Sequence, residues 1–365
     1  MSILTLFVVI PVLMLLGLWF SKNLAQVRGV MVAGASALLV LAIWLTVTFI
    51  QMRHAGNTDP MLFTYSVAWF PSLHIAYSVG VDGISVVMLL LSAIIVFTGT
   101  FASWQAMSNH KEYFLWFTLL STGVFGFFIS VDMFTMFMFY EVALIPMYLL
   151  IGVWGTGAKE YAAMKLTLML MGGSALLIIG ILAIYFFSGA TTMNINEIAA
   201  MANIPENVQN IFFPLLFIGF GVLGALFPFH TWSPDGHASA PTAVSMLHAG
   251  VLMKLGGYGC FRIAMYLMPS ALDTHLGHEA RETGETQVGQ TCHYIGNGEE
   301  RHYLHQSAEI AHVASAGTVV NHTDDSKEEG CHQTVGQHLD NGTGDGGLGN
   351  HAEGDEHHTT VGYRA

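Results

Sequence analysis

Charged residues are scarce in this sequence: Asp, Glu, Lys and Arg make up 10% of its 365 residues, against about 25% in an ordinary soluble domain. Cysteine is scarcer still. Cys260, Cys292 and Cys331 show no paired or CxxC spacing, which argues against a disulfide framework and against a zinc knuckle. Hydrophobic residues account for 53% of the chain. The composition therefore argues against a soluble protein and for a membrane protein.

The few charges are distributed unevenly along the chain. Residues 1–271 contain 8 Lys or Arg and 9 Asp or Glu, a net charge of −1. Residues 272–365 contain 4 and 16, a net charge of −12, together with 12 of the 18 histidines and no Phe, Trp, Met or Pro. We therefore interpret the first region as an apolar body and the second as a separate polar tail.

Eight apolar stretches are long enough to cross a bilayer, which takes about 20 residues. They cover residues 2–20, 30–50, 82–103, 113–130, 132–153, 163–187, 210–228 and 241–266. Because unpaired backbone groups are costly in lipid, such runs predict a bundle of helices. No basic run precedes the first stretch and no cleavage site follows it, so we expect a retained span rather than a signal peptide. The fold class predicted is an all-α polytopic membrane protein.

Basic residues between the stretches predict the orientation, because they are enriched in cytoplasmic loops. Lys22 and Arg28 follow the first stretch, His110 and Lys111 follow the third, and Lys159 follows the fifth. The alternate loops carry only Arg53. We therefore expect a periplasmic N-terminus, with a short surface helix over residues 193–201 on the periplasmic side.

Two ionisable residues lie well inside predicted spans, where a charge is costly and indicates function. Glu141 lies about ten residues into the fifth stretch, near Pro146, and Lys254 lies in the middle of the eighth. A lysine in apolar surroundings exchanges protons more readily, and a nearby carboxylate opposes this effect, so the two types can form a switch. The alternatives are a structural polar contact for Glu141 and a permanent ion pair for Lys254.

Lys165 and His248 allow two interpretations each, and Asp132 is a further charged residue of the body. Lys165, near the start of the sixth stretch, could take part in proton transfer or reach the cytoplasmic interface. His248, six residues before Lys254, could relay protons or simply bond to a neighbouring helix. Asp132 stands at a span boundary, where we expect a solvated helix start.

The segment between the last two stretches, LFPFHTWSPDGHASAPTA, is the most polar part of the body. Its prolines break or bend helices, and a broken helix at membrane depth is tolerated only where it lines a cavity. His230, Asp235 and His237 lie within it. We predict that these three residues form the cytoplasmic mouth of a proton path; a metal site is the alternative.

The same segment carries a family resemblance. HTWSPDGHASAPTAVSMLHAGVLMKLGGYG (230–259), FYEVALIPMYLLIGVWG (139–155) and AAMKLTLMLMGGS (162–174) resemble, in order, the antiporter-like subunits of respiratory complex I. The IPMYLLIG string is most similar to subunit M of bacterial NADH:quinone oxidoreductase, rather than to its sister subunits or to multisubunit cation/proton antiporters. The resemblance covers about residues 1–270.

This resemblance implies that Glu141 tunes a pumping lysine and that Lys254 lies on a central polar axis. It also implies that NADH, flavin, iron–sulfur clusters and quinone belong to other subunits, with no cofactor or metal bound in this chain. The expected partners are other membrane subunits of complex I and the lipid of the bacterial inner membrane, with no nucleic acid. The expected function is redox-coupled proton translocation; the alternatives are a subunit of a multisubunit Na⁺/H⁺ antiporter and a non-functional fragment.

The sequence departs from the family pattern in two ways. Where the family has a lysine in its seventh span, this sequence has Leu223, and we hypothesise that His248 or Lys165 takes over part of the role. The body also matches only the first half of an inverted-repeat fold. We expect three regions: residues 1–110 with the first three spans, 111–271 with the antiporter-like spans, and 272–365 as the tail.

The tail shows no apolar period of a helix or strand, so it predicts no ordinary core. It could be a disordered, metal-buffering segment, since His follows Cys at Cys292 and at Cys331. It could also be a polar periplasmic domain, or the translation of a wrong strand or frame.

Overall fold

The computed structural model describes residues 2–57, 59–70, 74–104, 110–189, 191–201 and 204–273, and the account that follows concerns these residues. The polar tail, apart from its first two residues, lies outside them. The three interpretations of the tail, with Cys292 and Cys331, are therefore untested.

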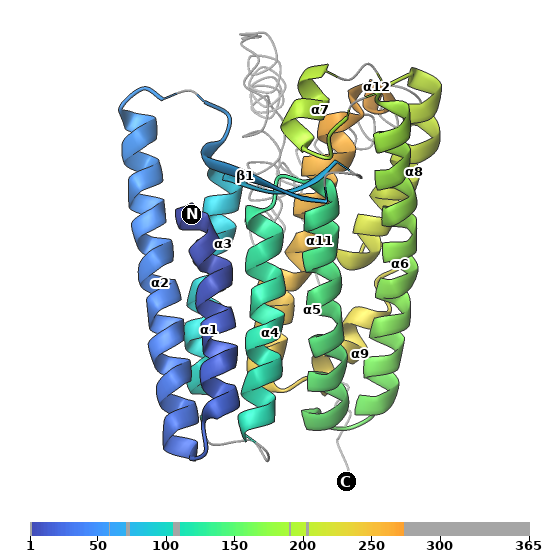
Figure 1. Ribbon diagram of the computed structural model, residues 1–365. Coiled ribbons are helices and arrows are strands. Elements are labelled where there is room, and N and C mark those ends of the chain that lie inside the picture. Colours follow the sequence, from blue (N-terminus) through green and yellow to red (C-terminus); the bar gives the residue numbers. More distant parts are fainter. Residues whose placement is uncertain are drawn as a thin grey trace, which may run out of the picture. The chain divides into compact units, whose positions relative to one another are not determined.

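Within the described residues, seven helices are long and apolar enough to cross a membrane. They are η1 with α1 (Ile3–Phe20), α2 (Leu24–His54), α3 (Gly83–Ala102), α4 (His110–Ile129), α5 (Met133–Trp154), α6 (Lys159–Phe187) and α8 (Glu206–Leu223) (Figure 1). Each coincides with one of the first seven predicted stretches. The prediction of a polytopic helical membrane protein is confirmed.

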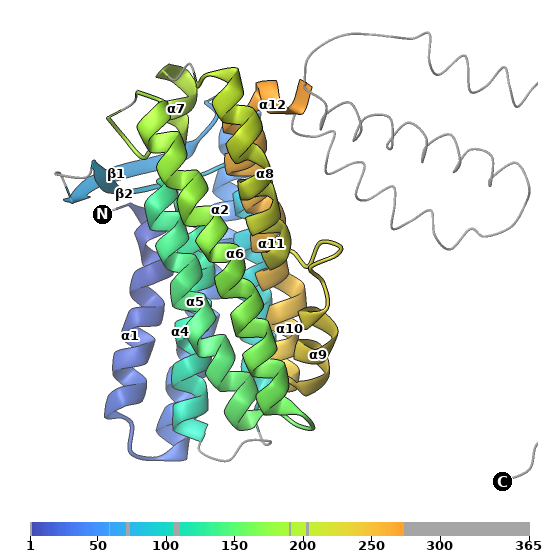
Figure 2. The same cartoon turned by 90° about the vertical axis from the view of Figure 1, so that its right-hand side faces the viewer.

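The eighth predicted stretch is helical but irregular. It consists of α10 (Thr242–Leu247), the π-helical η3 (His248–Leu252), α11 (Met253–Gly259) and the π-helical η4 (Cys260–Met265). None of these pieces alone has the length of a membrane span, so seven of the eight predicted spans stand as single long helices. Figure 2 shows α10 and α11 following one another, with α11 beside α8 and the short α9 (Trp232–Ser239) next to α10.

A pair of β-strands, which the sequence did not predict, accompanies the helices. Strands β1 (Leu62–Phe70) and β2 (Ile75–Val81) pair antiparallel in the long segment between α2 and α3. β1 is rich in aromatic residues, Val and Thr, which favour strands. The backbone N–H of Val131 donates to the carbonyl of Ser78 at 2.9 Å, so the sheet is bonded to the turn between α4 and α5.

The short helix α7 (Ile195–Met201) confirms the helix predicted over residues 193–201. Its preceding residue Asn194 forms a bridge with Asp132, so α7 joins the same end of the helical bundle as the two strands (Figure 1).

Helix α4 lies at the centre of the described bundle, where it packs against α1, α2, α3 and α5. Most of its aromatic side chains are buried, among them Phe117 and Phe125. The later helices continue this packing, α5 against α6 and α6 against α8. The candidate site residues of α5, α6 and the irregular helix are therefore carried by adjoining elements.

Candidate functional site

Glu141 lies in the first half of α5, one turn before Pro146. Its side chain is half-buried, and its Oε1 atom is buried without a hydrogen-bond partner. The hydroxyl of Ser174 in α6 interacts with the carboxylate. Within the described residues, Glu141 forms no ion pair. A carboxylate held this way can change its protonation state without breaking an ion pair.

Lys254 lies in α11, between the two π-helical segments. Its side chain is exposed on the surface of the chain, and its Nζ donates to the carbonyl oxygen of Ala249 at 2.7 Å. Within the described residues, Lys254 has no carboxylate partner. The predicted Glu141–Lys254 switch is thus not a direct ion pair in this structure.

His248 is fully buried between two aromatic rings. Its ring stacks on that of His237, with centroids 4.3 Å apart, and on that of Trp232, with centroids 5.2 Å apart. Neither ring nitrogen of His248 has a hydrogen-bond partner, whereas Nδ1 of His237 lies 3.1 Å from the hydroxyl of Ser245. Burial lowers the pKa of His237, which favours its neutral form. The stack joins α9 to η3.

Lys165 and Asp235 form an ion pair, with Nζ and Oδ2 2.7 Å apart. The pair connects α6 to α9, and both side chains are partly exposed. His230 lies just before α9, with its ring 5.5 Å from that of Phe227 and its Nδ1 buried without a partner. The structure thus places Asp235 and His237 on the same short helix, α9. Lys165 pairs with Asp235, and His248 stacks on His237.

Leu223 is the last residue of α8 and is fully buried. Of the two residues expected to compensate for it, Lys165 precedes Ser174 in α6 by nine residues. At about 1.5 Å of rise per residue, that separation is about 14 Å along the helix. Since Ser174 marks the level of Glu141, a direct contact between Lys165 and Glu141 is too long for a side chain to span.

One polar cluster was not predicted from the sequence. Asp82 precedes α3, and its Oδ2 atom forms an ion pair with Nη1 of Arg262 in η4 at 3.2 Å. Each of the two residues stands near the end of a predicted span, where charges are ordinarily solvated, and the pairing brings together residues 180 positions apart. The only signal available was that both lie next to membrane stretches.

Asp132 corrects a further expectation. It was predicted at a solvated helix start, but its residue is only 1% exposed. Its carboxylate caps α5 by accepting from the N–H of Thr135 at 2.9 Å. The strand β2 covers this end of the bundle, because the N–H of Ala76 also donates to Asp132, at 3.4 Å.

Among the described residues, no group of three or more His, Cys, Asp or Glu side chains is arranged to hold a metal ion. His230, just before α9, and Asp235 and His237 within it therefore form no metal centre in this part of the chain.

Comparison with known proteins identifies a family for the second half of the body. Residues 130–276 match the family model described as "NADH:quinone oxidoreductase/Mrp antiporter, TM". The chain is 38% identical over 207 residues to NAD(P)H-quinone oxidoreductase chain 4-2 of Synechocystis sp., covering 56% of this chain and 36% of that protein. It is 33% identical over 248 residues to NADH-quinone oxidoreductase subunit M of Rickettsia bellii, covering 67% and 49%.

A chain of respiratory complex I from Thermus thermophilus superposes with a TM-score of 0.66 at 23% identity, covering 75% of this chain and 55% of that chain. The chain thus spans about half or less of the length of the relatives it matches. It is a multi-pass membrane protein with the fold of the antiporter-like subunits of complex I, and its residues 130–276 are similar to the NADH:quinone oxidoreductase/Mrp antiporter transmembrane family.

Proposed function

We propose that this chain is a membrane subunit of a proton-translocating NADH:quinone oxidoreductase, in which it moves protons while other subunits carry out the redox reaction. The relatives named above support this assignment, since both are called quinone oxidoreductase subunits. The observation that carries it is Glu141, an unpaired carboxylate inside a membrane helix. A charge without an ion partner is costly at such a place unless it takes part in function.

In the proposed path, protons enter from the end of the bundle that carries the Lys165–Asp235 pair. His237 and His248 follow, because a neutral imidazole can accept a proton at one nitrogen and donate from the other. Their rings are stacked, so in this proposal a water molecule carries the proton between their in-plane nitrogens. Glu141 and Lys254 then exchange protons within the membrane. The carbonyl of Ala249 accepts a hydrogen bond from the Lys254 amine and so stabilises its charged form.

For the position of Leu223 we favour His248 over Lys165 as the compensating residue. Lys165 is already paired with Asp235 and lies about 14 Å along the helix from the level of Glu141. His248 is buried with both nitrogens free of hydrogen bonds, so protonation there breaks no existing contact.

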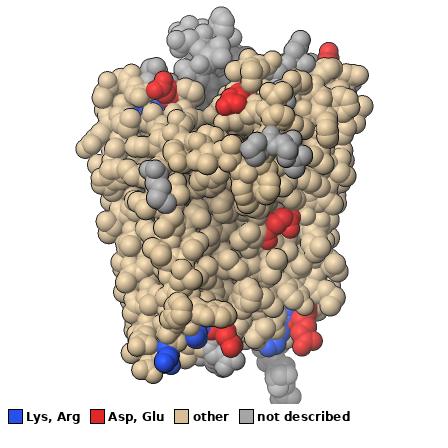
Figure 3. Space-filling model, in the orientation of Figure 1, with Lys and Arg blue, Asp and Glu red and all other residues tan. Residues whose placement is uncertain are grey.

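In the proposed orientation the chain lies in a bacterial inner membrane with its N-terminus on the periplasmic side. Lys and Arg gather at the lower end of the face drawn in Figure 3, where α1 turns into α2. At this end Lys111 donates to the carbonyl of Trp19 at 2.7 Å, and Arg28 to that of Trp104 at 2.6 Å. By the positive-inside rule this end faces the cytoplasm. Exposed apolar side chains of α1 and α2, such as Phe20 and Val40, are available to lipid or to neighbouring subunits.

A subunit of a multisubunit Na⁺/H⁺ antiporter is the second candidate, because the matching family model covers Mrp antiporters as well. In that case the chain would exchange sodium for protons without any link to NADH oxidation.

The test compares Lys254→Ala with the unchanged chain in inverted membrane vesicles, by following NADH-driven acidification of the vesicle lumen. We expect acidification to fall while NADH oxidation continues, whereas Lys22→Ala, an exposed lysine outside the spans, leaves both unchanged. Sodium-dependent proton release without any NADH response would support the antiporter. No effect of Lys254→Ala on either activity would contradict both candidates.

A further inference from the structure

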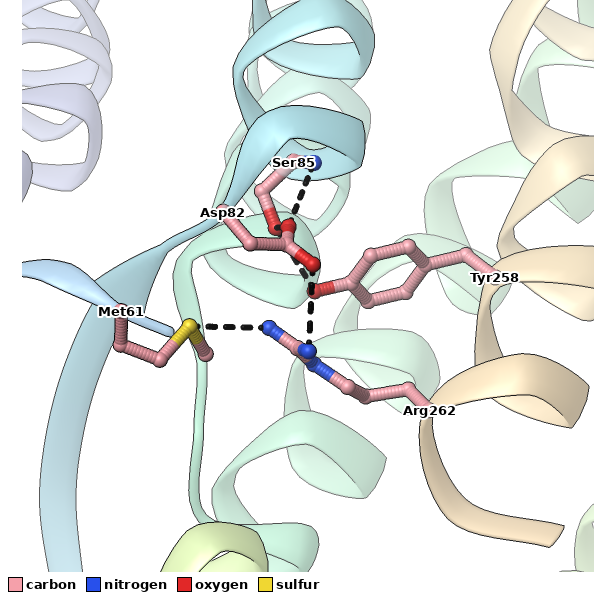
Figure 4. Close-up of polar contacts among 5 residues, drawn as sticks. All are labelled: Met61, Asp82, Ser85, Tyr258 and Arg262. Carbon is pink, nitrogen blue, oxygen red and sulfur yellow. Dashed lines mark hydrogen bonds and ion pairs between the residues drawn. The ribbon is translucent and has the colours of Figure 1, made fainter. Parts of the chain in front are cut away.

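Four polar side chains meet where the start of α3 approaches the irregular helix (Figure 4). Oδ1 of Asp82 accepts from the N–H of Ser85 at 2.9 Å and from its hydroxyl at 2.7 Å, while Oδ2 faces Arg262 at 3.2 Å. The hydroxyls of Ser85 and Tyr258 lie 2.8 Å apart. Nη2 of Arg262 contacts the sulfur of Met61, just before β1, at 3.1 Å.

This cluster is largely removed from water and lipid. The side chains of Asp82 and Arg262 are 20% and 13% exposed, and Ser85 and Tyr258 are buried. A buried ion pair contributes little net stability, because the loss of solvation offsets the attraction between the charges. Losing one partner is costly all the same, since the other charge is left buried and unpaired. Such a pair is best explained by the geometry that it imposes.

The irregular helix that carries Arg262 needs a contact that fixes its rotation about its own axis. In a regular α-helix each residue advances about 100° around the axis, so the hydrogen-bond ladder fixes where every side chain points. A π-helical turn accommodates one extra residue, and such turns are typical of functional sites. Lys254 lies in the seven residues of α11 between η3 and η4. Moving either π-helical turn past Lys254 would rotate its side chain by about 100°.

Packing against α8 holds this helix only in part. Gly256 faces the backbone of Gly224 in the contact between α11 and the end of α8, where neither residue has a side chain to interlock, while the ring of Phe220 lies against Gly259. At its N-terminal side the helix is held by the Trp232–His248–His237 stack. At its C-terminal side, Tyr258 and Arg262 attach it to Ser85 and Asp82.

We infer that Asp82 and Arg262 are positioning residues for Lys254: their ion pair fixes the rotation of the irregular helix and keeps the lysine amine at the carbonyl of Ala249. The inference rests on the proposed function only in assigning proton transfer to Lys254. Residues next to the two strands thereby act on a group about two helical turns away in the membrane.

The test measures the position of residue 254 directly, without proton translocation. Lys254→Cys is made in the full-length chain, assembled in its native membrane, after the other cysteines have been changed to serine (Cys260, Cys292 and Cys331). The alkylation rate of the new cysteine by a membrane-permeant maleimide is then compared with and without Asp82→Asn. We expect the rate to fall by about tenfold, because residue 254 is exposed in the structure and a rotation of about 100° would turn it toward the packed side of the helix.

Combining Asp82→Asn with Arg262→Gln should change the rate no further than Asp82→Asn alone, because both substitutions remove the same ion pair, whereas a general loss of folding would add up. The matched control is Glu197→Gln, because Glu197 is an exposed carboxylate on α7, outside the spans and without a contact to the cluster. If Asp82→Asn prevents accumulation of the chain, Arg262→Lys keeps the charge and should give a smaller change of the same sign. Unchanged alkylation in the accumulated variants would overturn the inference.

The outcome is separable from the proposed function. If Lys254→Ala left acidification intact, the proton-transfer role would be lost, while the alkylation rates would still report whether the ion pair positions residue 254.

Discussion

The carboxylates at the strand-bearing end of the bundle differ from the carboxylate and the imidazole in its middle. At the end, both carboxylate oxygens of Asp82 are engaged, and the carboxylate of Asp132 accepts two backbone N–H groups. In the middle, Oε1 of Glu141 and both ring nitrogens of His248 are buried without partners. The first arrangement resists a change of charge, because protonating Asp82 would leave Arg262 unpaired.

The difference shows two roles for buried polar side chains, whose burial costs free energy, in one membrane bundle. Satisfied groups hold elements together and are expensive to alter. Unsatisfied groups carry a standing cost, which a purely structural role does not explain. The comparison therefore predicts that substituting the carboxylates at the end changes mainly the stability of the chain. Substituting Glu141 or His248 in the middle should change mainly proton transfer.

The largest difference between the effect on proton translocation and the effect on stability is expected for His248→Leu. Because its ring nitrogens have no partners, an apolar replacement should leave thermal stability unchanged or raise it. Proton translocation by the assembled complex should fall by about 100-fold, the lower end of general acid–base contributions. Acidification of inverted vesicles, normalised to chain content, measures this effect. Translocation equal to that of the unchanged chain would remove His248 from the path.

Gly256→Ala tests whether the middle is held by packing rather than by charge. A methyl group at Gly256 would lie 2.8 Å from Cα of Gly224, so α11 and α8 would have to separate. We expect a loss of about 1–3 kcal/mol of stability, as for other overpacked sites. Gly257→Ala is the matched control, because a methyl group there has nothing within 4 Å. Equal melting temperatures in detergent for the two variants would contradict the close contact.

Asp132→Ala tests the end of the bundle. Removing a helix N-cap costs about 0.5–2 kcal/mol, and here the N–H of Ala76 also loses its acceptor. Asp132→Asn keeps an acceptor oxygen and should retain most of the stability. Melting temperature and acidification per assembled chain are measured together. A variant of normal stability with impaired acidification would place Asp132 in the proton path instead.

The smallest effect on stability is expected for Lys165→Gln, because partly exposed ion pairs are solvated and contribute little. Its melting temperature should match that of the unchanged chain. Acidification should fall less than in His248→Leu, since water can replace the lysine at an open mouth. A loss as complete as that expected for His248→Leu would move Lys165 from the mouth to the centre of the path.

The sequence predicted the long helices well because hydropathy needs only length and composition, as the coincidence of α4 and α5 with their stretches shows. It also singled out Glu141 and His248, since each is a rare polar residue within an apolar run. It could not reveal the π-helical turns at His248–Leu252 and Cys260–Met265, which shift register without changing composition.

Contacts between distant segments were missed for a related reason. Asp82 and Arg262 pair across most of the body, and neither shows a local pattern that would predict it. The strands β1 and β2 were hidden in a segment too short and too mixed for a span, and Asp132 was misjudged because those strands cover it.

The most direct test of the account is the number of protons translocated per NADH oxidised by membranes carrying Glu141→Gln, with Glu197→Gln as an exposed control. The amide keeps the shape of the carboxylate but cannot take up and release the proton. We predict a lower ratio for Glu141→Gln, with assembly and the control ratio unchanged. A ratio equal to that of the unchanged chain would contradict the claim that the unpaired groups in the middle of this bundle carry protons.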